Sequence, residues 1–304
     1  MVKLLSGKIA VVAGATRGAG RAIAVCLGAA GATVYCTGRS VRGSLASGAE
    51  RQETIEESAE LVTAAGGIGR WVQTDHTVES QVVALFERVR EEAGRVDILV
   101  NDVWGGDALS QWGTPLAALD LGKGFTMLER AVHSHIITTR YALPLMEPNN
   151  SGLIIEITDG DQMGYRGALF YDLVKTSVMR LAYSYARELR HSNITSLAVT
   201  PGFLRSEAML DMFGVTEANW RDAAKQDPHF IASETPTYLG RAIVALATDP
   251  AVRAKSGRTL ATWSLAKEYG FTDADGTQPD WGSYYASIAD SMGDTAFERI
   301  MFQS

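Results

Sequence analysis

The segment that most constrains the fold lies near the N-terminus, where a short apolar run leads into a glycine-rich loop. Residues 8–12 are long enough for one buried strand, and residues 14–20 follow with the spacing Gly-x-x-x-Gly-x-Gly. Residues 19–30 then read as an apolar, alanine-rich helix. Glycines let a backbone approach a phosphate closely, and a helix N-terminus offers free N–H groups. This order predicts a dinucleotide site; an ordinary glycine-rich turn is the alternative.

The residues after the second expected strand bear on the choice between NAD and NADP. Residues 33–37 read as a strand, and Gly38, Arg39 and Ser40 follow it. NAD sites usually carry an acid here for the ribose 2′-hydroxyl, whereas NADP sites carry an arginine for the 2′-phosphate. No acid is present, and a guanidinium suits a phosphate, so the sequence favours NADP(H) over NAD. The alternative is that Arg39 and Arg42 are solvated loop charges.

Tyr171 and Lys175 stand four residues apart in a segment with helical character. At this spacing two side chains share one face of a helix. A free phenol has a pKa of about 10, and an ammonium group within roughly 4–6 Å lowers it by about 1–3 units. We therefore expect Lys175 to make Tyr171 acidic enough to exchange a proton with a carbonyl oxygen or an alcohol. The pair alone is weak support, because this spacing occurs by chance in many helices.

Several motifs together resemble the short-chain dehydrogenase/reductase family over about residues 5–265. They are the glycine loop, Asn101-Asp102-Val103, the Tyr171 and Lys175 pair, and Pro201-Gly202. The resemblance implies catalytic roles for Tyr171, Lys175 and Thr158, which takes the place of the family's serine. Residues 269–276 further resemble the family's dehydrogenase/reductase member 1-like branch. The cofactor contacts that the resemblance implies are Gly14, Thr16, Arg17, Gly18, Ala19, Gly20, Arg39, Ser40, Asp75, Asn101, Tyr171, Lys175, Pro201, Gly202 and Ser206.

Two features depart from the family or add to it. The helix near residues 126–143 lacks the asparagine that helps relay protons in relatives, so His133 or His135 is a candidate to hold the relay water. The alternative is that these histidines are packed or surface residues. Asp159 follows Thr158 and either forms a turn or faces the pocket, where it would favour a cationic or hydroxyl-rich substrate. In the pocket it would also oppose Lys175 by favouring the neutral phenol.

The alternation of apolar runs predicts an α/β fold with a Rossmann-type, doubly wound parallel sheet. We expect a single domain over residues 1–304, with its core at about 5–265 and a C-terminal extension at 266–304. That extension should pack on the body or on a neighbouring subunit. Strands are expected near 8–13, 33–37, 69–73, 97–101, 152–157, 194–199 and 258–263. Helices are expected near 19–30, 53–65, 78–93, 125–146, 168–190 and 235–248.

Composition excludes several classes of function. The net charge of −7 argues against nucleic acid and anionic membranes as partners, and no apolar run approaches the length of a membrane span. Cys26 and Cys36 read as buried thiols of a cytoplasmic protein, and no zinc pattern or other metal site is evident. A homodimer or homotetramer is the usual symmetric assembly. Residues 104–124 are expected to form one wall of the substrate pocket, and residues 206–232 either cover the substrate as a flap or pack as ordinary core. Trp104, Asp159, Phe203 and Met209 are the pocket candidates.

The sequence therefore predicts an NADP(H)-dependent oxidoreductase that interconverts a carbonyl compound and an alcohol by hydride transfer, with Tyr171 as general acid and base. The same fold and residues also suit an imine reductase, a dehydratase or an epimerase. A non-catalytic NADP-binding regulator is the alternative from a different class.

Overall fold

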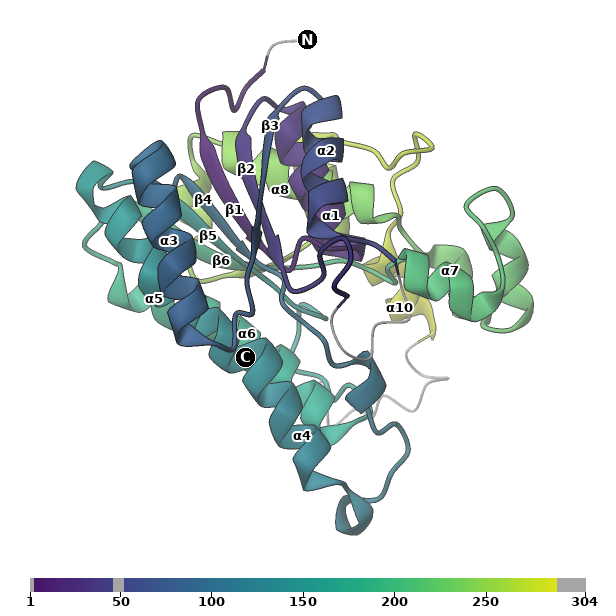
Figure 1. Cartoon of the computed structure of the whole chain (residues 1–304). Coiled ribbons are helices and arrows are strands. Elements are labelled where there is room, and N and C mark those ends of the chain that lie inside the picture. Colours follow the sequence, from purple (N-terminus) through teal and green to yellow (C-terminus); the bar gives the residue numbers. More distant parts are fainter. Residues whose placement is uncertain (1–2, 46–51, 289–304) are drawn as a thin grey trace.

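A seven-stranded, fully parallel sheet forms the centre of the molecule, in the order β3-β2-β1-β4-β5-β6-β7 (Figure 1). The computed structural model describes residues 3–45 and 52–288. The strands are β1 (Ile9–Ala13), β2 (Thr33–Gly38), β3 (Ile68–Gln73), β4 (Ile98–Asn101), β5 (Gly152–Ile157), β6 (Ile194–Thr200) and β7 (Thr259–Ala261). The expected Rossmann-type sheet is thus confirmed. The last strand is shorter than the expected 258–263, because Thr262 already begins a helix.

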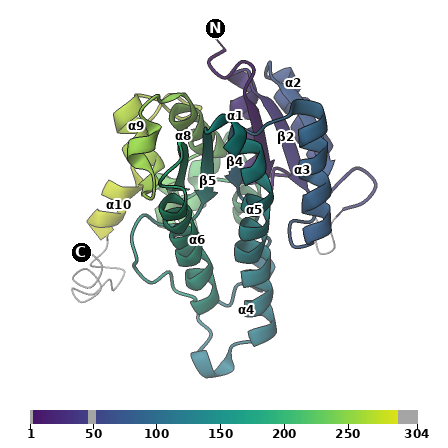
Figure 2. The same ribbon diagram turned by 90° about the vertical axis from the view of Figure 1, so that its left-hand side faces the viewer.

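Helices cover both faces of this sheet (Figures 1 and 2). One face carries α1 (Gly18–Ala29), α2 (Ile55–Ala64), α8 (Pro236–Thr248) and α9 (Thr262–Tyr269). The other face carries α3 (Glu79–Ala93), α5 (Ser134–Met146) and α6 (Leu169–Glu188). Both faces of every central strand are therefore buried, which explains why the strands read as continuous apolar runs and not as alternating ones.

Strand β1 shows how the two cores are divided. Ala10 and Val12 pack on the α1 side of the sheet, whereas Val11 packs on the α3 and α5 side. All three side chains are fully buried, because successive residues of a strand point to opposite faces. Burying a valine of this kind stabilises the fold by about 1.5–3 kcal/mol. The strand that leads into the glycine loop is accordingly anchored from both sides.

The long helix expected at 125–146 is present but is not regular throughout. It begins earlier, as α4 (Leu121–Leu128), where the Asp120 side chain caps the N-terminus by accepting from Lys123 N. A π-helical turn at Glu129–His133 then connects α4 to α5. Single π turns inside α-helices are frequent at functional sites. Figure 2 shows α4 and α5 end to end, with α6 alongside them, and the α4 end projecting beyond the sheet.

The segment at residues 206–232 forms α7 (Glu207–Phe213) and two 3₁₀ turns, Trp220–Lys225 and Pro228–Ala232. Its apolar side chains pack mainly on one another, around the buried Phe230 ring. After α9 the chain continues to α10 (Trp281–Ile288), whose Trp281 ring lies 5.7 Å from that of Phe203. The C-terminal extension therefore contacts the body within the described residues. Phe297 and Phe302 lie outside them.

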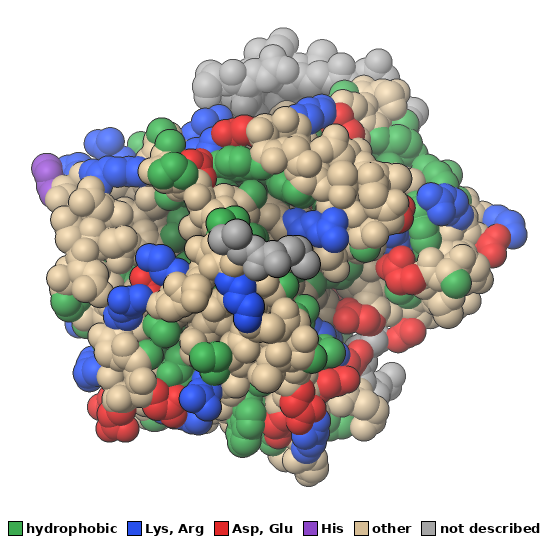
Figure 3. All heavy atoms as spheres, turned by 90° about the horizontal axis from the view of Figure 1, so that it is seen from above, with side chains coloured by type: hydrophobic (Ala, Val, Ile, Leu, Met, Phe, Trp, Pro, Cys, Tyr) green, Lys and Arg blue, Asp and Glu red, His purple; other side chains and the backbone are tan. Residues whose placement is uncertain are grey.

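The surface carries charges of both signs, and Figure 3 shows basic, acidic and apolar side chains intermixed on one face. Among the helices that the structure describes, none is both long and apolar enough to cross a membrane. Burial raises the pKa of Cys26 to about 11 and that of Cys36 to about 12, so both thiols stay protonated at neutral pH.

Candidate active site

The expected site residues come together at the carboxyl ends of four adjacent strands. Gly14 follows β1, Asn101 ends β4, Thr158 follows β5 and Pro201 follows β6. The strand order reverses between β1 and β4, and ligands of such sheets bind at this switch point.

The glycine loop depends on glycine at two positions where backbones meet. A Cβ on Gly14 would lie 2.5 Å from the Asp102 carbonyl oxygen, and one on Gly20 would lie 2.4 Å from the Gly14 carbonyl oxygen. Gly14 also has a φ of 90°, which disfavours any other residue. Helix α1 begins at Gly18, and Arg17 before it provides no side-chain cap. The first N–H groups of α1 thus depend on acceptors from elsewhere in the chain, and Gly20 N donates to the Asp102 carboxylate.

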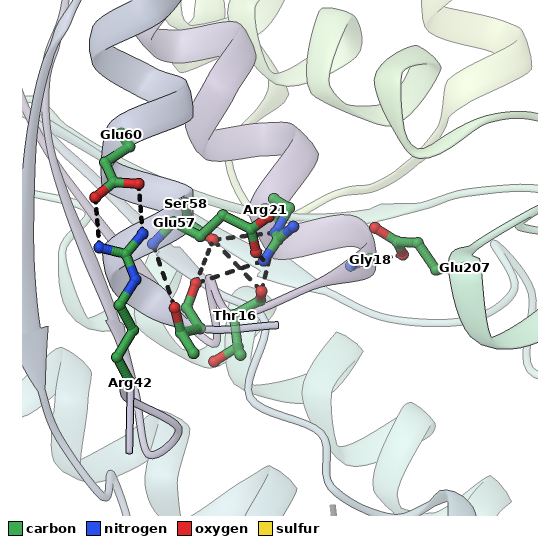
Figure 4. A network of polar contacts seen from close by, with 9 residues as sticks. Thr16, Gly18, Arg21, Arg42, Glu57, Ser58, Glu60 and Glu207 are labelled. Carbon is green, nitrogen blue, oxygen red and sulfur yellow. Dashed lines mark hydrogen bonds and ion pairs between the residues drawn. The ribbon is translucent and has the colours of Figure 1, made fainter. Parts of the chain in front are cut away.

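A carboxylate from a distant element lies at this helix N-terminus. Glu207 Oε2, on α7, accepts a hydrogen bond of 3.0 Å from Gly18 N (Figure 4). Ser206 precedes it and caps α7 by accepting from Met209 N. An anionic oxygen is what the positive end of a helix favours, and a diphosphate has the same chemistry. The loop and its donors therefore fit the diphosphate of a dinucleotide.

Two arginines lie on the side of the site where the 2′-phosphate is predicted to bind, and they differ in how firmly they are paired with acidic side chains. Arg42 is committed to Glu60 through two contacts of 2.7 and 2.5 Å (Figure 4). Arg39 lies 3.9 Å from Asp75 and keeps its side chain partly exposed. Burial raises the pKa of Asp75, but hydrogen bonds from Thr77 outweigh it and leave that pKa below its usual value. Arg39 is accordingly the better placed of the two for an incoming phosphate.

The remaining cofactor candidates occupy structural positions around the loop. The Thr16 carbonyl accepts from Arg21, whose guanidinium also pairs with Glu57 (Figure 4). Ala19 lies in the first turn of α1, and Ser40 is buried. Gly202 N donates to Glu234, an acid that the motifs did not single out. Burial raises the pKa of Glu234 to about 8.

Tyr171 and Lys175 lie on α6, as expected, and Asp159 lies between β5 and α6. The Tyr171 hydroxyl donates to Asp159 Oδ2 at 2.8 Å. Lys175 Nζ lies 4.2 Å from the centre of the Trp104 ring and 5.5 Å from that of Tyr171. The buried Thr158 hydroxyl donates to the Lys175 carbonyl oxygen at 2.7 Å, which ties β5 to α6. The structure thus brings the three catalytic candidates together, and adds Asp159.

The electrostatics differ from the expectation that Lys175 acidifies the phenol. Burial, reinforced by Asp159, raises the pKa of Tyr171 far above its usual value. Burial also lowers the pKa of Lys175, against the attraction of Asp159 and Asp102. The carboxylate has the stronger effect on Tyr171 because it accepts directly from the hydroxyl, whereas the ammonium group lies near ring faces. Tyr171 is held in its protonated form in this arrangement.

The two histidine candidates have different surroundings. His133 is exposed, whereas His135 is buried and lies between Glu156 Oε2 at 2.6 Å and the Val103 carbonyl at 3.0 Å. The Asn101 amide donates to the other Glu156 oxygen at 2.7 Å, so three polar side chains form one buried network. Glu156 was not predicted as a site residue, although an acid inside an apolar run is a visible signal.

Aromatic rings border Tyr171 on two sides. Trp104 meets it edge-on with 5.4 Å between ring centres, and Trp112 is tilted at 4.9 Å. These contacts agree with the expectation that residues 104–124 border the site. Phe203 and Met209 instead pack into the cluster around Phe230. No group of three or more His, Cys, Asp or Glu side chains within residues 3–45 and 52–288 is arranged to hold a metal ion.

Comparison with known proteins identifies the group to which the chain is related. The model of the short chain dehydrogenase family matches residues 8–213. The chain belongs to the short-chain dehydrogenase/reductase family. It is 34% identical over 286 residues to dehydrogenase/reductase SDR family member 1 of Mus musculus, with 91% of this chain and 86% of that protein covered. The resemblance expected from the motifs is therefore confirmed.

Further relatives lie at greater distance. The chain is 31% identical to 7alpha-hydroxysteroid dehydrogenase of Clostridium sardiniense, over 69% of this chain and 76% of that protein. A crystal structure of a short chain dehydrogenase from Mycobacterium thermoresistibile has the same fold, with a TM-score of 0.74, 22% identity and coverage of 91% and 92% of the two chains. Membership makes the chain an oxidoreductase with a nicotinamide cofactor, and the glycine loop fits that cofactor.

Proposed function

We propose that this protein uses NADPH to reduce a carbonyl compound to an alcohol, with Tyr171 as the proton donor. The proposal rests on the position of Tyr171, which lies beside Lys175 on α6. The glycine loop follows β1 at the same carboxyl edge of the sheet. The bound nicotinamide would supply a hydride to the carbonyl carbon. The residues of the chain then have to bind the carbonyl oxygen and deliver one proton to it.

Tyr171 is suited to that delivery. Burial and Asp159 keep its hydroxyl protonated, so it begins the reaction with the proton that the developing alkoxide needs. The partly buried Lys175 ammonium beside it would stabilise negative charge on the oxygen as the hydride arrives. One hydride on carbon and one proton on oxygen complete the alcohol.

Thr158 has a different role in this arrangement from the one the family resemblance implied. Its hydroxyl donates to the Lys175 carbonyl oxygen, so it positions α6 against β5. A hydroxyl has one proton, and while that proton is given to Lys175 the oxygen can only accept. Tyr171 also gives its proton to an acceptor, Asp159, but that acceptor is a side chain, and once the Tyr171 hydroxyl turns from it the proton is free for a bound carbonyl oxygen.

The preference for NADPH rests on Arg39. Its guanidinium is partly exposed next to Asp75, whereas Arg42 is held by Glu60. Replacing Arg39 with alanine should weaken NADPH binding by roughly 10- to 100-fold, the value of a charge-assisted contact to phosphate, and leave NADH binding unchanged. Arg42→Ala is the matched control and should change neither. Equal losses for both cofactors in Arg39→Ala would contradict the assignment.

The activity itself is tested by following NADPH absorbance with a panel of aldehydes and ketones and identifying the products. We expect NADPH to be consumed in step with alcohol formation. Isomerised or dehydrated products without net NADPH consumption would instead indicate an epimerase or a dehydratase. Tight NADPH binding without turnover of any carbonyl or imine compound would indicate a regulatory protein.

A further inference from the structure

Asp159 places a carboxylate at the point where the substrate has to meet Tyr171. Its Oδ2 accepts from the Tyr171 hydroxyl at 2.8 Å. The neighbouring Arg166 guanidinium does not pair with that carboxylate: it binds Asp172 and the backbone carbonyl of Asp159. Within the described residues, the Asp159 carboxylate forms no close salt bridge, although the Lys175 ammonium attracts it from farther away. A carboxylate can accept about four hydrogen bonds, so Asp159 has capacity for a cationic donor.

The aromatic rings next to Tyr171, the residue that Asp159 contacts, suit a cation. The Trp104 and Trp112 rings flank Tyr171, and tryptophan faces attract ammonium groups. Trp104 already has the Lys175 ammonium over it at 4.2 Å. Trp112 is 57% exposed, and over the part of the chain that the structure describes no lysine or arginine lies over its face. Its face is available to a second cation.

The other charged groups near Tyr171 do not cancel the attraction of Asp159 for a cation. Asp107 accepts from Trp104 Nε1 at 2.6 Å, and its charge acts on both Tyr171 and Lys175. Arg166 is the basic group that acts on the Tyr171 phenol, and its guanidinium is occupied by its own partners. The Lys175 ammonium is attracted by both Asp159 and Asp107. Asp107 is held by Trp104, so Asp159 is the acid next to Tyr171 that keeps hydrogen-bonding capacity for a ligand.

We propose that the substrate of this enzyme carries a protonated amine a few bonds from its carbonyl group. Asp159 accepts a hydrogen bond from the ammonium, Trp112 covers it, and the Tyr171 hydroxyl turns from Asp159 to the carbonyl oxygen. This substrate class rests on the carbonyl reduction proposed above. Asp159 is then a specificity-determining residue that contacts substrate.

The same contact adjusts the acidity of Tyr171. In the free enzyme the carboxylate favours the neutral phenol, in addition to the effect of burial. A bound ammonium group offsets that negative charge and adds a positive one, and both changes make the phenol a stronger acid. A cationic substrate therefore increases the acidity of the Tyr171 hydroxyl that protonates it. With a neutral ketone, the negative charge of Asp159 continues to oppose proton transfer from Tyr171. The preference for a cationic over a neutral ketone should therefore appear in kcat as well as in KM.

The test compares two ketones of the same shape. One is γ-dimethylaminobutyrophenone, which is protonated at neutral pH, and the other is the neutral ketone in which a C–H replaces its N–H. We expect the wild type to favour the ammonium ketone in kcat/KM by roughly 10- to 100-fold, as for a hydrogen bond to a charged group. Asp159→Asn should abolish this preference and raise kcat for the neutral ketone. Asp161→Asn, in the same loop, is the matched control and should keep the wild-type preference.

A binding measurement keeps the proposal testable if neither ketone turns over. Titration of the amino alcohol product, followed by tryptophan fluorescence, should show weaker binding to Asp159→Asn than to the wild type and to Asp161→Asn. Equal binding by all three proteins, or an unchanged ketone preference in Asp159→Asn, would overturn the proposal. Failure of the proposed reduction is distinct: neither ketone would consume NADPH, while the amino alcohol would still bind through Asp159.

Discussion

The contact between Glu207 and the glycine loop leads to a quantitative prediction about cofactor affinity. In the free protein Glu207 Oε2 takes the Gly18 N–H at 3.0 Å, at the helix end where a diphosphate would bind. The two anions compete for the same donor and repel each other. A hydrogen bond to a charged group contributes about 1.5–3 kcal/mol, and the partial exposure of Glu207 favours the lower end of that range.

Removing the charge should therefore strengthen NADPH binding. In Glu207→Gln, relief of about 1.5 kcal/mol corresponds to a Kd about tenfold lower than that of the wild type. The free variant should also unfold at a slightly lower temperature, because α1 loses a charged acceptor at its N-terminus. The stabilisation produced by saturating NADPH should be correspondingly larger than in the wild type.

The assay is calorimetric titration with NADPH, paired with thermal unfolding with and without the cofactor. Asp222→Asn is the matched control: it removes an acid from the same 206–232 segment, where Asp222 pairs with Lys225. That variant should bind NADPH like the wild type. An unchanged or higher Kd in Glu207→Gln would refute the reasoning, because it would show that Glu207 does not compete with the diphosphate or contributes to its binding.

Three further outcomes follow from the contacts of the site. Asp159→Asn should lower the pKa of Tyr171, because the carboxylate that accepts from the hydroxyl is removed, so that the alkaline loss of neutral-ketone reduction moves to lower pH in a kcat/KM profile; an unmoved limb would contradict it. His135→Leu leaves Glu156 Oε2 buried without the His135 ring as its hydrogen-bond partner and should lower the free energy of unfolding by about 1–3 kcal/mol in urea titrations, whereas the double change with Glu156→Leu should recover part of the loss. Gly20→Ala forces α1 away from Gly14 and should abolish NADPH binding or folding, whereas Gly164→Ala, with nothing within 4 Å of the added carbon, should leave binding and melting temperature unchanged.

The fold was predictable because its signals are local and repeat along the chain. Both faces of β1 are buried, so residues 9–13 had to be apolar throughout, and the strand-loop-helix order around Gly14 and Gly20 fixed the first unit of the sheet. The early start of α4 at Leu121 was missed because it depends on a cap from Asp120 in an otherwise irregular segment. Thr262 was assigned to a strand because its apolar neighbours fit a short strand and a buried helix equally well.

The candidate site was predictable in its members but not in its contacts. The motifs selected Tyr171 and Lys175, and the structure places both beside Trp104. Whether Lys175 or Asp159 has the larger effect on the pKa of Tyr171 was not predictable, because it depends on which of the two side chains the hydroxyl contacts directly. Glu207 lies 189 positions from Gly18 in the sequence, and only the folded chain brings the two together.

The central claim, that Tyr171 delivers the proton during hydride transfer, is tested most directly by single turnover of a ketone on protein preloaded with NADPH. Tyr171→Phe should bind NADPH with nearly unchanged Kd, yet transfer hydride at least about 100-fold more slowly than the wild type. Tyr165→Phe, an exposed tyrosine in the loop before α6, should behave like the wild type. Hydride transfer at the wild-type rate in Tyr171→Phe would contradict the account.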